Sequence, residues 1–509
     1  MHRCAYLLII PLALSAFTHL WNPIGYPDLF SDEGVYIRRA LHILEGFGPQ
    51  ETETYYDNPF FGQLFLAGIF KFLNYPDSFG YSTDLHTIEL FFAVPRLLTG
   101  GLAVFDTFLV YRISEIRYNR NVALVASVLF AVMPMSWFTR RILLESIQLP
   151  FLLSSILCAL YLGKLISAQK NKNSTSKNIA LVLVSGLLLG ASIFTKIPAF
   201  VMIPLIGYLI FRNSNRSWRL LRLWIIPVVL IPIIWPIYSL AYDQFGYWWD
   251  SVRTQTAREG VPLTSTISFL LQIDPILIIL GTSGLVVAIL KKDLFLLLWA
   301  IPNFIFLVVI AFGWAPYQLF IPIIPLLCIA SAKLIFDLTR AIKRRRIKKI
   351  LPWSVIGAIG TFGLISTSIL ITTNVTSGQF QIIRFVALYL ENNINRNESI
   401  MVVSNPIYSW IFKYVYHKDN VLNEVNDFDY EPVKTKKILF ISDVESEGIS
   451  PDSERLRTLY NTTNQIFKIN GLSNNFDTTK YPYASMFENY ESMDGTELRV
   501  CIAKCVNYD

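Results

Sequence analysis

Two acidic groups stand close together in one polar stretch, residues 23–85, directly after the first apolar segment of the chain. One is the adjacent pair Asp32 and Glu33, and the other is centred on Asp57. A carboxylate can accept the proton of an attacking hydroxyl, which typically contributes about 10²–10⁴ in rate. Neighbouring residues on a helix point about 100° apart, so we expect one carboxylate of the pair to face a site while the other caps or pairs. Asp32, Glu33 and Asp57 are therefore the candidate catalytic residues, with Asp32 as the preferred base.

Cationic side chains recur near the ends of the apolar segments, where they could hold a phosphate. Arg binds phosphate in a bidentate manner and Lys binds it as a point charge. Ionisable groups at membrane depth are costly and are candidates for function, whereas snorkelling or ion pairing between helices is the structural alternative for each. The cations selected on these grounds are Arg96, Arg140, Arg141, Lys196, Arg253 and Arg258, the last two beside the aromatic run Tyr247–Trp249, and the carboxylate Glu145 beside Arg140 and Arg141 is selected as an ionisable group at the same depth.

The elements that must position these residues are membrane helices. The 509-residue chain is 53% hydrophobic and only 16% charged, against about 25% charged residues in soluble domains. In lipid, only helices and closed barrels satisfy the backbone, and barrel strands would give short alternating segments in place of the long apolar runs found here. We predict an α-helical polytopic membrane protein whose apolar segments house the tail of a lipid substrate while the polar residues handle its phosphate.

About eleven apolar segments are long enough, some only just, to cross a hydrocarbon core of about 30 Å. The first segment also fits a cleaved signal peptide, which would leave the orientation of the remaining chain unchanged. The segments are residues 5–22, 88–111, 122–138, 142–163, 179–195, 197–211, 223–241, 268–290, 294–312, 317–337 and 353–373.

The loops between these segments sort by charge. Lys and Arg cluster in alternate loops, which the positive-inside rule assigns to the cytoplasm. The net charge of +7 therefore reports membrane orientation, and no nucleic-acid partner is expected. The acidic stretch 23–85 and the C-terminal tail are then predicted outside the cytoplasm, at the cell membrane or, in a eukaryote, in the endoplasmic reticulum. The basic loops lie near residues 112–120, 164–177, 212–222, 291–292 and 340–349.

Beyond the last apolar segment the composition changes to that of a soluble domain. Residues 399–404 and 437–442 are predicted to be buried strands, with a helix over 406–416 between them. This order is typical of a small α/β or α+β domain. We therefore divide the chain into a transmembrane catalytic domain, residues 1–373, and an extracytoplasmic domain, residues 374–509.

Several short motifs follow one another in a fixed order over about residues 20–340. They are Asp32-Glu33 with Tyr36, Asp57-Asn58-Pro59-Phe60, Val94–Leu98, Pro134 with Arg140–Glu145, Gly190–Lys196, and Pro316-Tyr317 with Pro322 and Pro325. In type and order these motifs resemble the GT-C superfamily of polyprenyl-phosphate-sugar-dependent glycosyltransferases. The resemblance is to the branch that holds the protein O-mannosyltransferases and the aminoarabinose transferases of lipid A.

The resemblance implies an inverting glycosyltransferase with a polyprenyl-phosphate-linked sugar as donor and a protein, lipid or glycan as acceptor. It implies that Asp32 is the base and that polyprenyl phosphate is the leaving group. It also adds Tyr36, Asn58 and Tyr317 to the substrate-binding residues. Asn58 stands where the family has a basic or imidazole residue.

Three other hypotheses stay open. A lipid or polysaccharide transporter or flippase would place its charges along a path through the membrane, whereas here they gather at one face. An oligosaccharyltransferase, which uses a diphosphate donor, would favour a metal-binding acidic set and a larger outer domain. A non-catalytic assembly subunit would tolerate the substitution Asp32→Asn.

The sequence identifies no organic cofactor. A divalent cation such as Mg²⁺ or Mn²⁺ prefers oxygen ligands, and Asp57 is one carboxylate that could contribute to such a site. The sequence shows no convincing cluster of three ligands, so we assign no metal-binding residue.

Overall fold

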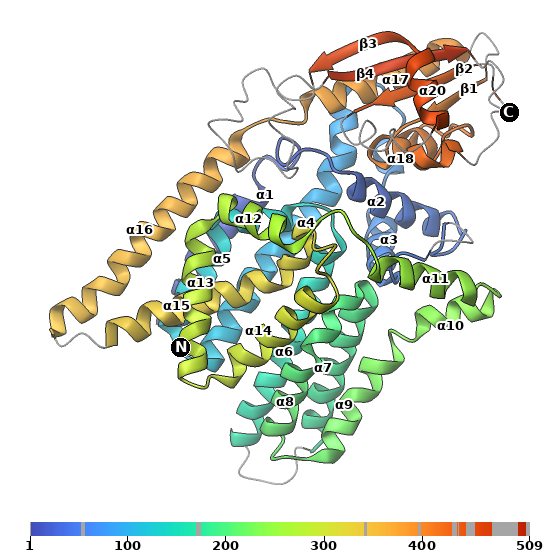
Figure 1. Ribbon diagram of the computed structural model, residues 1–509. Helices are drawn as coiled ribbons and strands as arrows, with labels where there is room; N and C mark the ends of the chain where they lie inside the picture. The colour runs from blue at the N-terminus through green and yellow to red at the C-terminus, as the bar shows by residue number, and fades with distance from the viewer. Residues whose placement is uncertain are drawn as a thin grey trace. The chain divides into compact units, whose positions relative to one another are not determined.

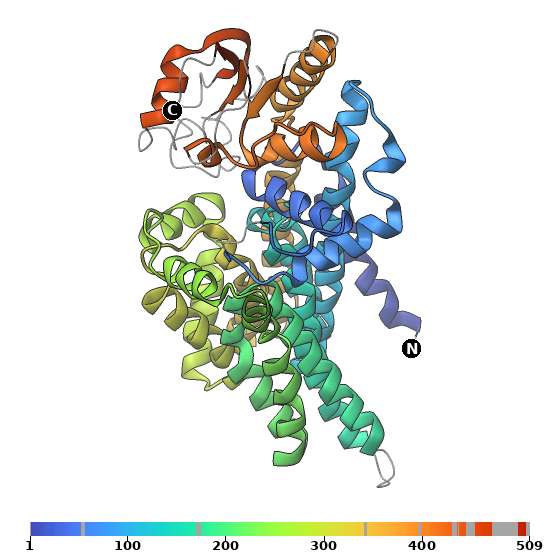
Figure 2. The same ribbon diagram turned by 90° about the vertical axis from the view of Figure 1, so that its right-hand side faces the viewer.

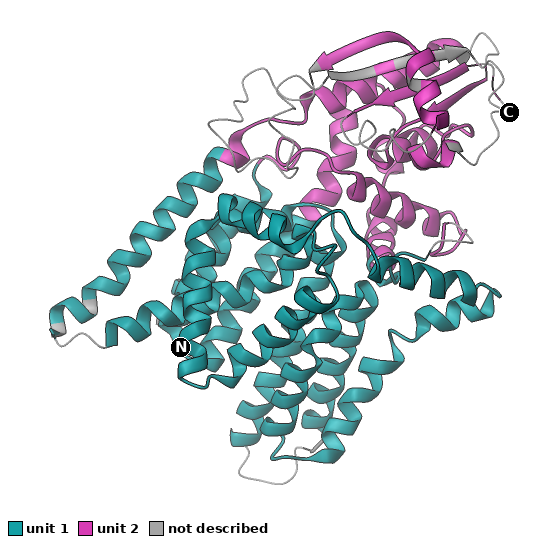
Figure 3. Ribbon diagram, in the orientation of Figure 1, with its two compact units in different colours: residues 1–21, 52–62, 99–369 teal, residues 22–51, 63–98, 370–509 magenta. Residues whose placement is uncertain are grey.

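The structure is a computed structural model that describes residues 2–51, 56–168, 175–340, 344–394, 399–429, 435, 437–443, 454–470 and 497–504 (Figure 1). The chain divides into two units, each assembled from three separate stretches (Figure 3). Unit 1 holds Met1–Trp21, Thr52–Gly62 and Thr99–Ile369, and unit 2 holds Asn22–Glu51, Gln63–Leu98 and Leu370–Asp509. The predicted domain boundary at residues 373 and 374 stays a prediction.

The elements of unit 1 are all helices in its described part, apart from one isolated β-bridge between Val261 and Trp314. In both views α6, α7, α8 and α9 lie side by side (Figures 1 and 2). Its elements are α1 (His2–Leu20), the second half of α4 (Leu85–Arg117), α5 (Arg120–Val132), η2 (Pro134–Arg140), α6 (Leu144–Ala168), α7 (Thr175–Thr195), η3 (Ile197–Met202), α8 (Ile203–Asn213), α9 (Trp218–Leu230), α10 (Ile234–Ala241), α11 (Phe245–Thr256), α12 (Leu263–Ile273), α13 (Pro275–Leu290), α14 (Leu294–Val309), η4 (Tyr317–Ile323), α15 (Ile324–Arg340) and most of α16 (Arg345–Thr372).

Six helices in the described ranges are long and apolar enough to cross a membrane, which agrees with an integral membrane protein of several spans. They are Leu85–Arg117, Leu144–Ser167, Ser176–Thr195, Trp218–Ala241, Tyr317–Arg340 and Arg346–Asn393. Two further pairs, α5 with η2 and α12 with α13, qualify only if each bent pair is one span, which raises the number to eight. The expected eleven spans are therefore not confirmed.

Each predicted apolar segment nevertheless overlaps a helix or a bent pair, and the difference in number has local causes. Three of the helices, Leu7–Leu20, Ile197–Asn213 and Leu294–Val309, are shorter than the six long ones. The pairs bend by 68° and 114° at their breaks, where Pro134 and Pro275 begin the second helix of each pair. Proline has no N–H group to continue the hydrogen bonding of the preceding helix, but it fits the first turn of a new one.

Unit 2 combines helices with one small sheet. Its elements are α2 (Ser31–Leu44), most of α3 (Phe61–Leu73), η1 (Asp77–Phe79), the first half of α4, α17 (Ser377–Ile394), β1 (Ile400–Val403), α18 (Pro406–Trp410), the π-helix η5 (Ile411–Val415), η6 (Val425–Asp429), β2 (Lys437–Ser442), α20 (Glu454–Thr462), β3 (Asn464–Asn470) and β4 (Glu497–Lys504).

The sheet confirms the predicted α and β content of the tail. Its strand order is β1-β2-β4-β3, with β1 and β2 parallel and the other neighbours antiparallel. The predicted strands match β1 and β2, and the predicted helix between them corresponds to α18 with η5. One apolar core joins β1 and β2 to α20 and includes Met401, Phe440 and Leu459.

Candidate active site

Asp32 and Glu33 lie in the first turn of α2, in unit 2. The helix begins at Ser31, so the two acids belong to the helix and not to the preceding loop. Carboxylates in the first turn interact favourably with the positive end of the helix dipole. Asp32 is half-buried, whereas the Glu33 and Tyr36 side chains are buried.

Glu33 is paired with Arg96 of α4, also in unit 2. Arg96 Nε donates to Glu33 Oε2 at 2.9 Å, and Arg96 Nη2 donates to Glu33 Oε1 at 2.7 Å. The remaining N–H groups of this arginine donate to the backbone oxygens of Pro23, Pro27 and Asp28 at 2.6–3.1 Å. A guanidinium has five N–H groups, and all five are used here, so a substrate contact by Arg96 would require one of these bonds to break.

The turn that carries Asp32 is packed tightly against the tail portion of unit 2. A Cβ atom added at Gly34 would lie 2.3 Å from the backbone oxygen of Pro406, the first residue of α18. Only glycine allows two backbones to approach this closely. The position of Asp32 is therefore fixed from two sides, by the Glu33–Arg96 pair and by the contact of Gly34 with α18.

A second buried ion pair in unit 2 had no clear signal in the sequence. Arg38 of α2 donates from Nε to Glu51 Oε1 at 2.6 Å and from Nη2 to Glu51 Oε2 at 2.9 Å. Burial alone would raise the pKa of Glu51, but the adjacent Arg38 guanidinium outweighs it and lowers this pKa to about 2. Arg38 also donates to the backbone oxygen of Asn423, so it connects α2 to the tail portion of the same unit.

Unit 1 contains a different carboxylate–cation pair, Glu145 with Lys196. Glu145 lies in the first turn of α6, and Lys196 precedes η3 at the end of α7. Lys196 Nζ donates to Glu145 Oε1, and their side chains are 19% and 1% exposed, respectively. Gln148 of α6 holds the backbone of this turn, because its Nε2 donates to the oxygens of Lys196 at 2.6 Å and Ser192 at 3.1 Å.

This pair is only partly satisfied. Within the described ranges, the buried Oε2 of Glu145 has no hydrogen-bond partner. In the same ranges, Glu145 is the single hydrogen-bond partner of the Lys196 ammonium. An ammonium has three N–H groups, and the side chain of Lys196 reaches solvent. Lys196 therefore has donors available for an anionic group.

Asp57 and Asn58 also lie in unit 1, in a segment that packs against Leu144 and Thr195, the neighbours in sequence of Glu145 and Lys196. A Cβ atom added at Gly62 would lie 2.5 Å from Leu144 Cδ2 and 3.1 Å from Thr195 Cγ2, so the segment passes beside the residues that adjoin Glu145 and Lys196. Asp57 accepts hydrogen bonds from the backbone and side-chain nitrogens of Asn58 at 2.8 and 3.1 Å. Both side chains are half-buried.

An aromatic cluster anchors this segment to the end of α7 and to α10 and α11. Its buried members are Tyr56, Phe60, Phe194 and Trp235, with Tyr238 and Trp248 packed against them. The Phe60 and Phe194 rings are 5.1 Å apart between centroids. Burial raises the pKa of Tyr56, whose hydroxyl donates to Gln244 Oε1. Asp57 is thus held close in the fold to the turn that carries Lys196.

Arg140 and Arg141 occupy the buried 3₁₀ turn between α5 and α6. Arg140 donates to the backbone oxygens of Thr18 at 2.9 Å and Trp21 at 2.6 Å. These carbonyls belong to the C-terminal end of α1, where a cation is favourable. Arg141 lies over the Trp137 ring, with its Cζ 5.7 Å from the ring centroid. Both arginines therefore have clear structural functions.

The last three predicted substrate-binding residues are distributed over other parts of unit 1. Tyr317 is buried at the start of η4, and its ring lies 4.6 Å from that of Phe138. Arg253 and Arg258 are exposed on and just after α11, and the Arg258 guanidinium lies over the Trp314 ring at 5.0 Å. The fold brings neither arginine into the described contacts of the Glu145–Lys196 pair.

The predicted site residues thus divide between the units. Asp32, Glu33, Tyr36 and Arg96 belong to unit 2, and the remaining ones belong to unit 1. Among the described residues, no group of three or more His, Cys, Asp or Glu side chains is placed to hold a metal ion. We therefore assign no metal ligand and derive no step through a metal.

Comparison with known proteins tests the resemblance drawn from the motifs. A family model described as dolichyl-phosphate-mannose-protein mannosyltransferase matches residues 93–239. This stretch includes Arg96, Arg140, Arg141, Glu145 and Lys196, and it begins after the acidic groups of residues 23–85. No curated protein matches the sequence.

Solved structures match nearly the whole chain. The oligosaccharyltransferase AglB from Archaeoglobus fulgidus, in complex with an inhibitory peptide and a dolichol-phosphate, aligns with a TM-score of 0.56 and 12% identity over 91% of this chain and 72% of AglB. ArnT from Cupriavidus metallidurans, bound to undecaprenyl phosphate, aligns with a TM-score of 0.54 and 11% identity over 98% and 97% of the two chains.

The chain has a GT-C fold. Identities this low show the fold alone, but the family match was found independently from the sequence. The resemblance inferred from the short motifs is thereby confirmed, and the comparisons together indicate a glycosyltransferase.

Proposed function

We propose that this protein transfers a sugar from a polyprenyl-phosphate donor to an extracytoplasmic protein, lipid or glycan, with inversion at the anomeric carbon. The observation that carries the proposal is the arrangement at the start of α2. Glu33 pairs with Arg96, and Asp32 lies beside it in the first turn, half-buried in a turn that is fixed by the contacts of Glu33 and Gly34. A general base needs this kind of fixed position.

In the proposed reaction the acceptor hydroxyl attacks the anomeric carbon of the donor sugar. The Asp32 carboxylate takes the hydroxyl proton, the new glycosidic bond forms, and the bond between the anomeric carbon and the phosphate oxygen breaks. Its electron pair leaves with the polyprenyl phosphate. A single displacement of this kind inverts the configuration of the carbon.

Lys196 is proposed to stabilise the phosphate as its charge grows. Among the described contacts, the Lys196 ammonium donates only to Glu145, so it has further N–H groups for a phosphate. Arg96 and Arg140, in contrast, donate to backbone carbonyls. We therefore propose positioning roles for these two arginines. Asp57, in the segment whose Phe60 packs against Phe194 near the end of α7, is proposed to orient substrate, with Asn58 as its hydrogen-bonded neighbour.

The donor class is supported by the family match and by two structural neighbours. The family match is to a mannosyltransferase that is described by a dolichyl-phosphate-mannose donor, the ArnT structure holds undecaprenyl phosphate, and the AglB structure holds dolichol-phosphate. The extracytoplasmic placement of the acids and of the C-terminal tail is supported by the alternation of Lys- and Arg-rich loops.

The proposal is tested with purified full-length protein and radiolabelled polyprenyl-phosphate sugars. Wild type should release or transfer sugar, and Asp32→Asn should reduce the rate by at least about 10²-fold. Asp77→Asn is the matched control, since it removes an exposed carboxylate of the same unit, and it should keep wild-type turnover. Wild-type turnover in Asp32→Asn would remove Asp32 as the base. Equal binding of donor by both proteins without turnover would favour a transporter, flippase or assembly subunit.

An oligosaccharyltransferase-like activity is the second candidate, because AglB is among the structural neighbours. The two candidates differ in donor and in metal requirement. A diphosphate-linked oligosaccharide should be used only by the second, and its turnover should stop after EDTA and return with Mg²⁺ or Mn²⁺. Use of a monophosphate-linked sugar that EDTA does not affect would reject it.

A further inference from the structure

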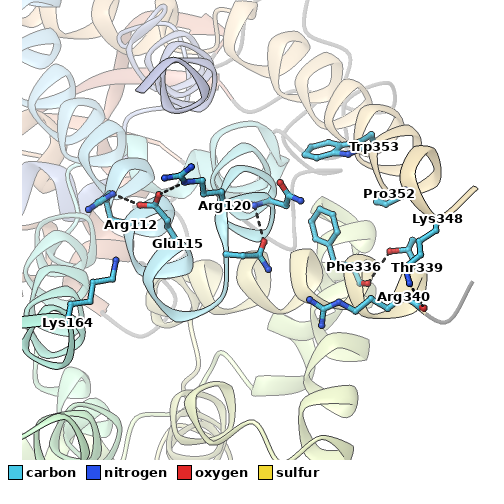
Figure 4. Close-up of a pocket in the computed structure, with 12 residues that line it drawn as sticks. Arg112, Glu115, Arg120, Lys164, Phe336, Thr339, Arg340, Lys348, Pro352 and Trp353 are labelled. Carbon is cyan, nitrogen blue, oxygen red and sulfur yellow. Dashed lines mark hydrogen bonds and ion pairs between the residues drawn. The ribbon is translucent and has the colours of Figure 1, made fainter. Parts of the chain in front are cut away.

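Unit 1 contains a large basic pocket that the proposed reaction does not use. Its volume is about 1310 Å³, larger than the 300–1,000 Å³ typical of small-molecule sites. It lies where the end of α4 and the start of α5 approach the end of α15 and the start of α16, and Lys164 of α6 also reaches it (Figure 4).

The charges that line this pocket are strongly unbalanced, although Arg340 also pairs with Asp337, outside the lining, at 3.4 Å. Five cationic side chains line it, against one carboxylate, Glu115. The cations are Arg112, Arg120, Lys164, Arg340 and Lys348. Glu115 does not neutralise the pocket, because it accepts from both Arg112 and Arg120 and so draws two guanidinium groups together.

One wall of the pocket is apolar. Phe336 of α15 and Trp353 of α16 pack with their ring centroids 6.0 Å apart, and Pro352 adjoins them. Figure 4 shows Arg112, Glu115 and Arg120 on one side of the pocket, and Trp353 on the opposite side. A ligand here would meet cations and an aromatic surface together.

The packing of α16 explains why the pocket exists. Its later turns lie directly on the end of α5, since Thr367 Oγ1 donates to the oxygen of Val132 at 2.7 Å, and a Cβ atom added at Gly363 would lie 2.8 Å from Met133 Sδ. At its first turns, in contrast, Lys348 Nζ reaches the oxygen of Arg340 at 3.1 Å. The pocket lies along the first turns of α16, where Lys348, Pro352 and Trp353 line it.

The pocket also stands at the ends of membrane helices. Four candidate spans each contribute one end to the pocket, and each of these ends lies at a basic loop assigned to the cytoplasm. The spans are Leu85–Arg117, Leu144–Ser167, Tyr317–Arg340 and Arg346–Asn393. Orientation by the positive-inside rule requires only that cations lie in these loops. It does not require them to converge from five helices on one cavity with an aromatic wall.

We propose that this pocket binds the headgroup of an anionic glycerophospholipid from the cytoplasmic leaflet. The phosphate would lie among the arginines and lysines, and the glycerol and upper acyl chains would lie along Phe336, Pro352 and Trp353. Basic pockets between membrane helices on this side suit anionic headgroups, and aromatic residues are favoured at the depth of the glycerol region. The site is separate from Asp57, Glu145 and Lys196, none of which lines it.

The test is native mass spectrometry of the full-length protein in mixed micelles with dioleoylphosphatidylglycerol. Wild type should retain this lipid, and the variant Arg120→Ala/Lys164→Ala/Arg340→Ala should bind it about 100-fold more weakly, at about a fivefold loss for each cation near a membrane surface. All three side chains are exposed, so the fold should be kept. Trp353→Ala should also weaken retention, by a smaller factor and with no change in charge.

The matched control is Arg212→Ala/Arg219→Ala/Arg222→Ala, which removes three exposed cations from another loop assigned to the cytoplasm. It should bind phosphatidylglycerol as wild type does. An equal loss in this control, or equal retention of dioleoylphosphatidylcholine by wild type, would overturn the proposal. So would displacement by millimolar inorganic phosphate, which indicates a free-phosphate site, or clear preference for undecaprenyl phosphate, which indicates a polyprenyl site. All readouts are binding measurements, so their outcome does not depend on transferase activity.

Discussion

The two units each hold a carboxylate–cation pair of the predicted site, and the pairs differ in how fully they are satisfied. In unit 2, all five N–H groups of Arg96 donate hydrogen bonds, two of these bonds go to Glu33, and both side chains are at most 1% exposed. In unit 1, Lys196 contacts Glu145 through one hydrogen bond among the described residues, and its side chain is 19% exposed.

This difference indicates that the Glu33–Arg96 pair stabilises the fold, whereas the Glu145–Lys196 pair can still bind a ligand. A buried ion pair must satisfy its remaining lone pairs and protons internally, or its desolvation cost is not repaid. Arg96 meets that condition through backbone oxygens. Lys196 and Glu145 do not meet it alone, and an anionic substrate group at the ammonium would complete the missing contacts.

The largest effect is expected from breaking the saturated pair. Arg96→Ala removes the guanidinium that pairs with the buried Glu33 carboxylate, together with three contacts to the loop before α2, so the free energy of unfolding should fall by about 3–5 kcal/mol. Thermal unfolding of the purified protein in detergent measures this change. Glu33→Gln/Arg96→Met, which removes both charges, should be less destabilised than Arg96→Ala. A change below about 1 kcal/mol in Arg96→Ala would contradict a structural role.

Lowering the pH should also reduce the stability of unit 2, through protonation of Glu51. The pKa of Glu51 is about 2 in the folded protein against an ordinary value of 4.5, so its ionised form adds stability at pH above about 4.5. That contribution, up to about 3 kcal/mol, is lost as the pH falls from about 4.5 towards 2.

Thermal unfolding followed between pH 6 and pH 3 tests this sensitivity to acid. Glu51→Gln should be less stable than wild type at pH 6 and should show a flatter pH dependence. Glu454→Gln, at an exposed position of α20, is the control and should follow wild type. An unchanged pH profile in Glu51→Gln would show that Arg38 does not hold this carboxylate ionised.

The unsaturated pair should affect binding more than stability. Lys196→Ala removes a point charge from the proposed phosphate site and should weaken donor binding by about 10–100-fold, or about 1.4–2.7 kcal/mol. Acceptor binding and thermal stability should change little. Lys292→Ala, an exposed lysine after α13, serves as the control, and equilibrium binding of a radiolabelled polyprenyl-phosphate sugar is the measurement. Unchanged donor affinity would remove Lys196 from the phosphate site.

The smallest effect is expected at Glu145. Glu145→Gln should change the free energy of unfolding by about 1 kcal/mol or less, because the Lys196 ammonium it leaves behind still reaches solvent. This outcome contrasts directly with Glu33→Gln, which leaves a fully buried guanidinium. Comparable destabilisation in the two variants, by thermal unfolding, would show that the pairs are equivalent.

Patterns along the chain were sufficient to predict most helices and part of the sheet. Apolar runs are visible without knowledge of the fold, and every run overlaps a helix or a bent pair. β1 and β2 are buried, apolar strands and were predicted. β3 and β4 were not, because Asn464–Asn470 and Glu497–Lys504 contain many polar residues and depend on pairing with each other.

Contacts between residues far apart in the sequence were harder to predict than helices and strands. The expectation that one acid of the first pair would be committed to an ion pair is met by Glu33, but the sequence does not identify Arg96 as its partner 63 positions away. Nor does it reveal Arg38 and Glu51, which have no helical spacing to connect them. Arg140 carries a charge like any candidate ligand, and only the fold shows that it caps α1.

The discontinuous composition of unit 2 has a consequence for biosynthesis. Residues 22–51 and 63–98 emerge first, but the segment that completes the unit begins at residue 370. At about 5–20 residues per second, the ribosome needs roughly 15–55 s to make the intervening residues 99–369. During that interval Glu33 and Arg96 can pair, whereas Gly34 has no α18 to pack against. A nascent chain that stalls before the tail therefore leaves this surface open to chaperones and proteases.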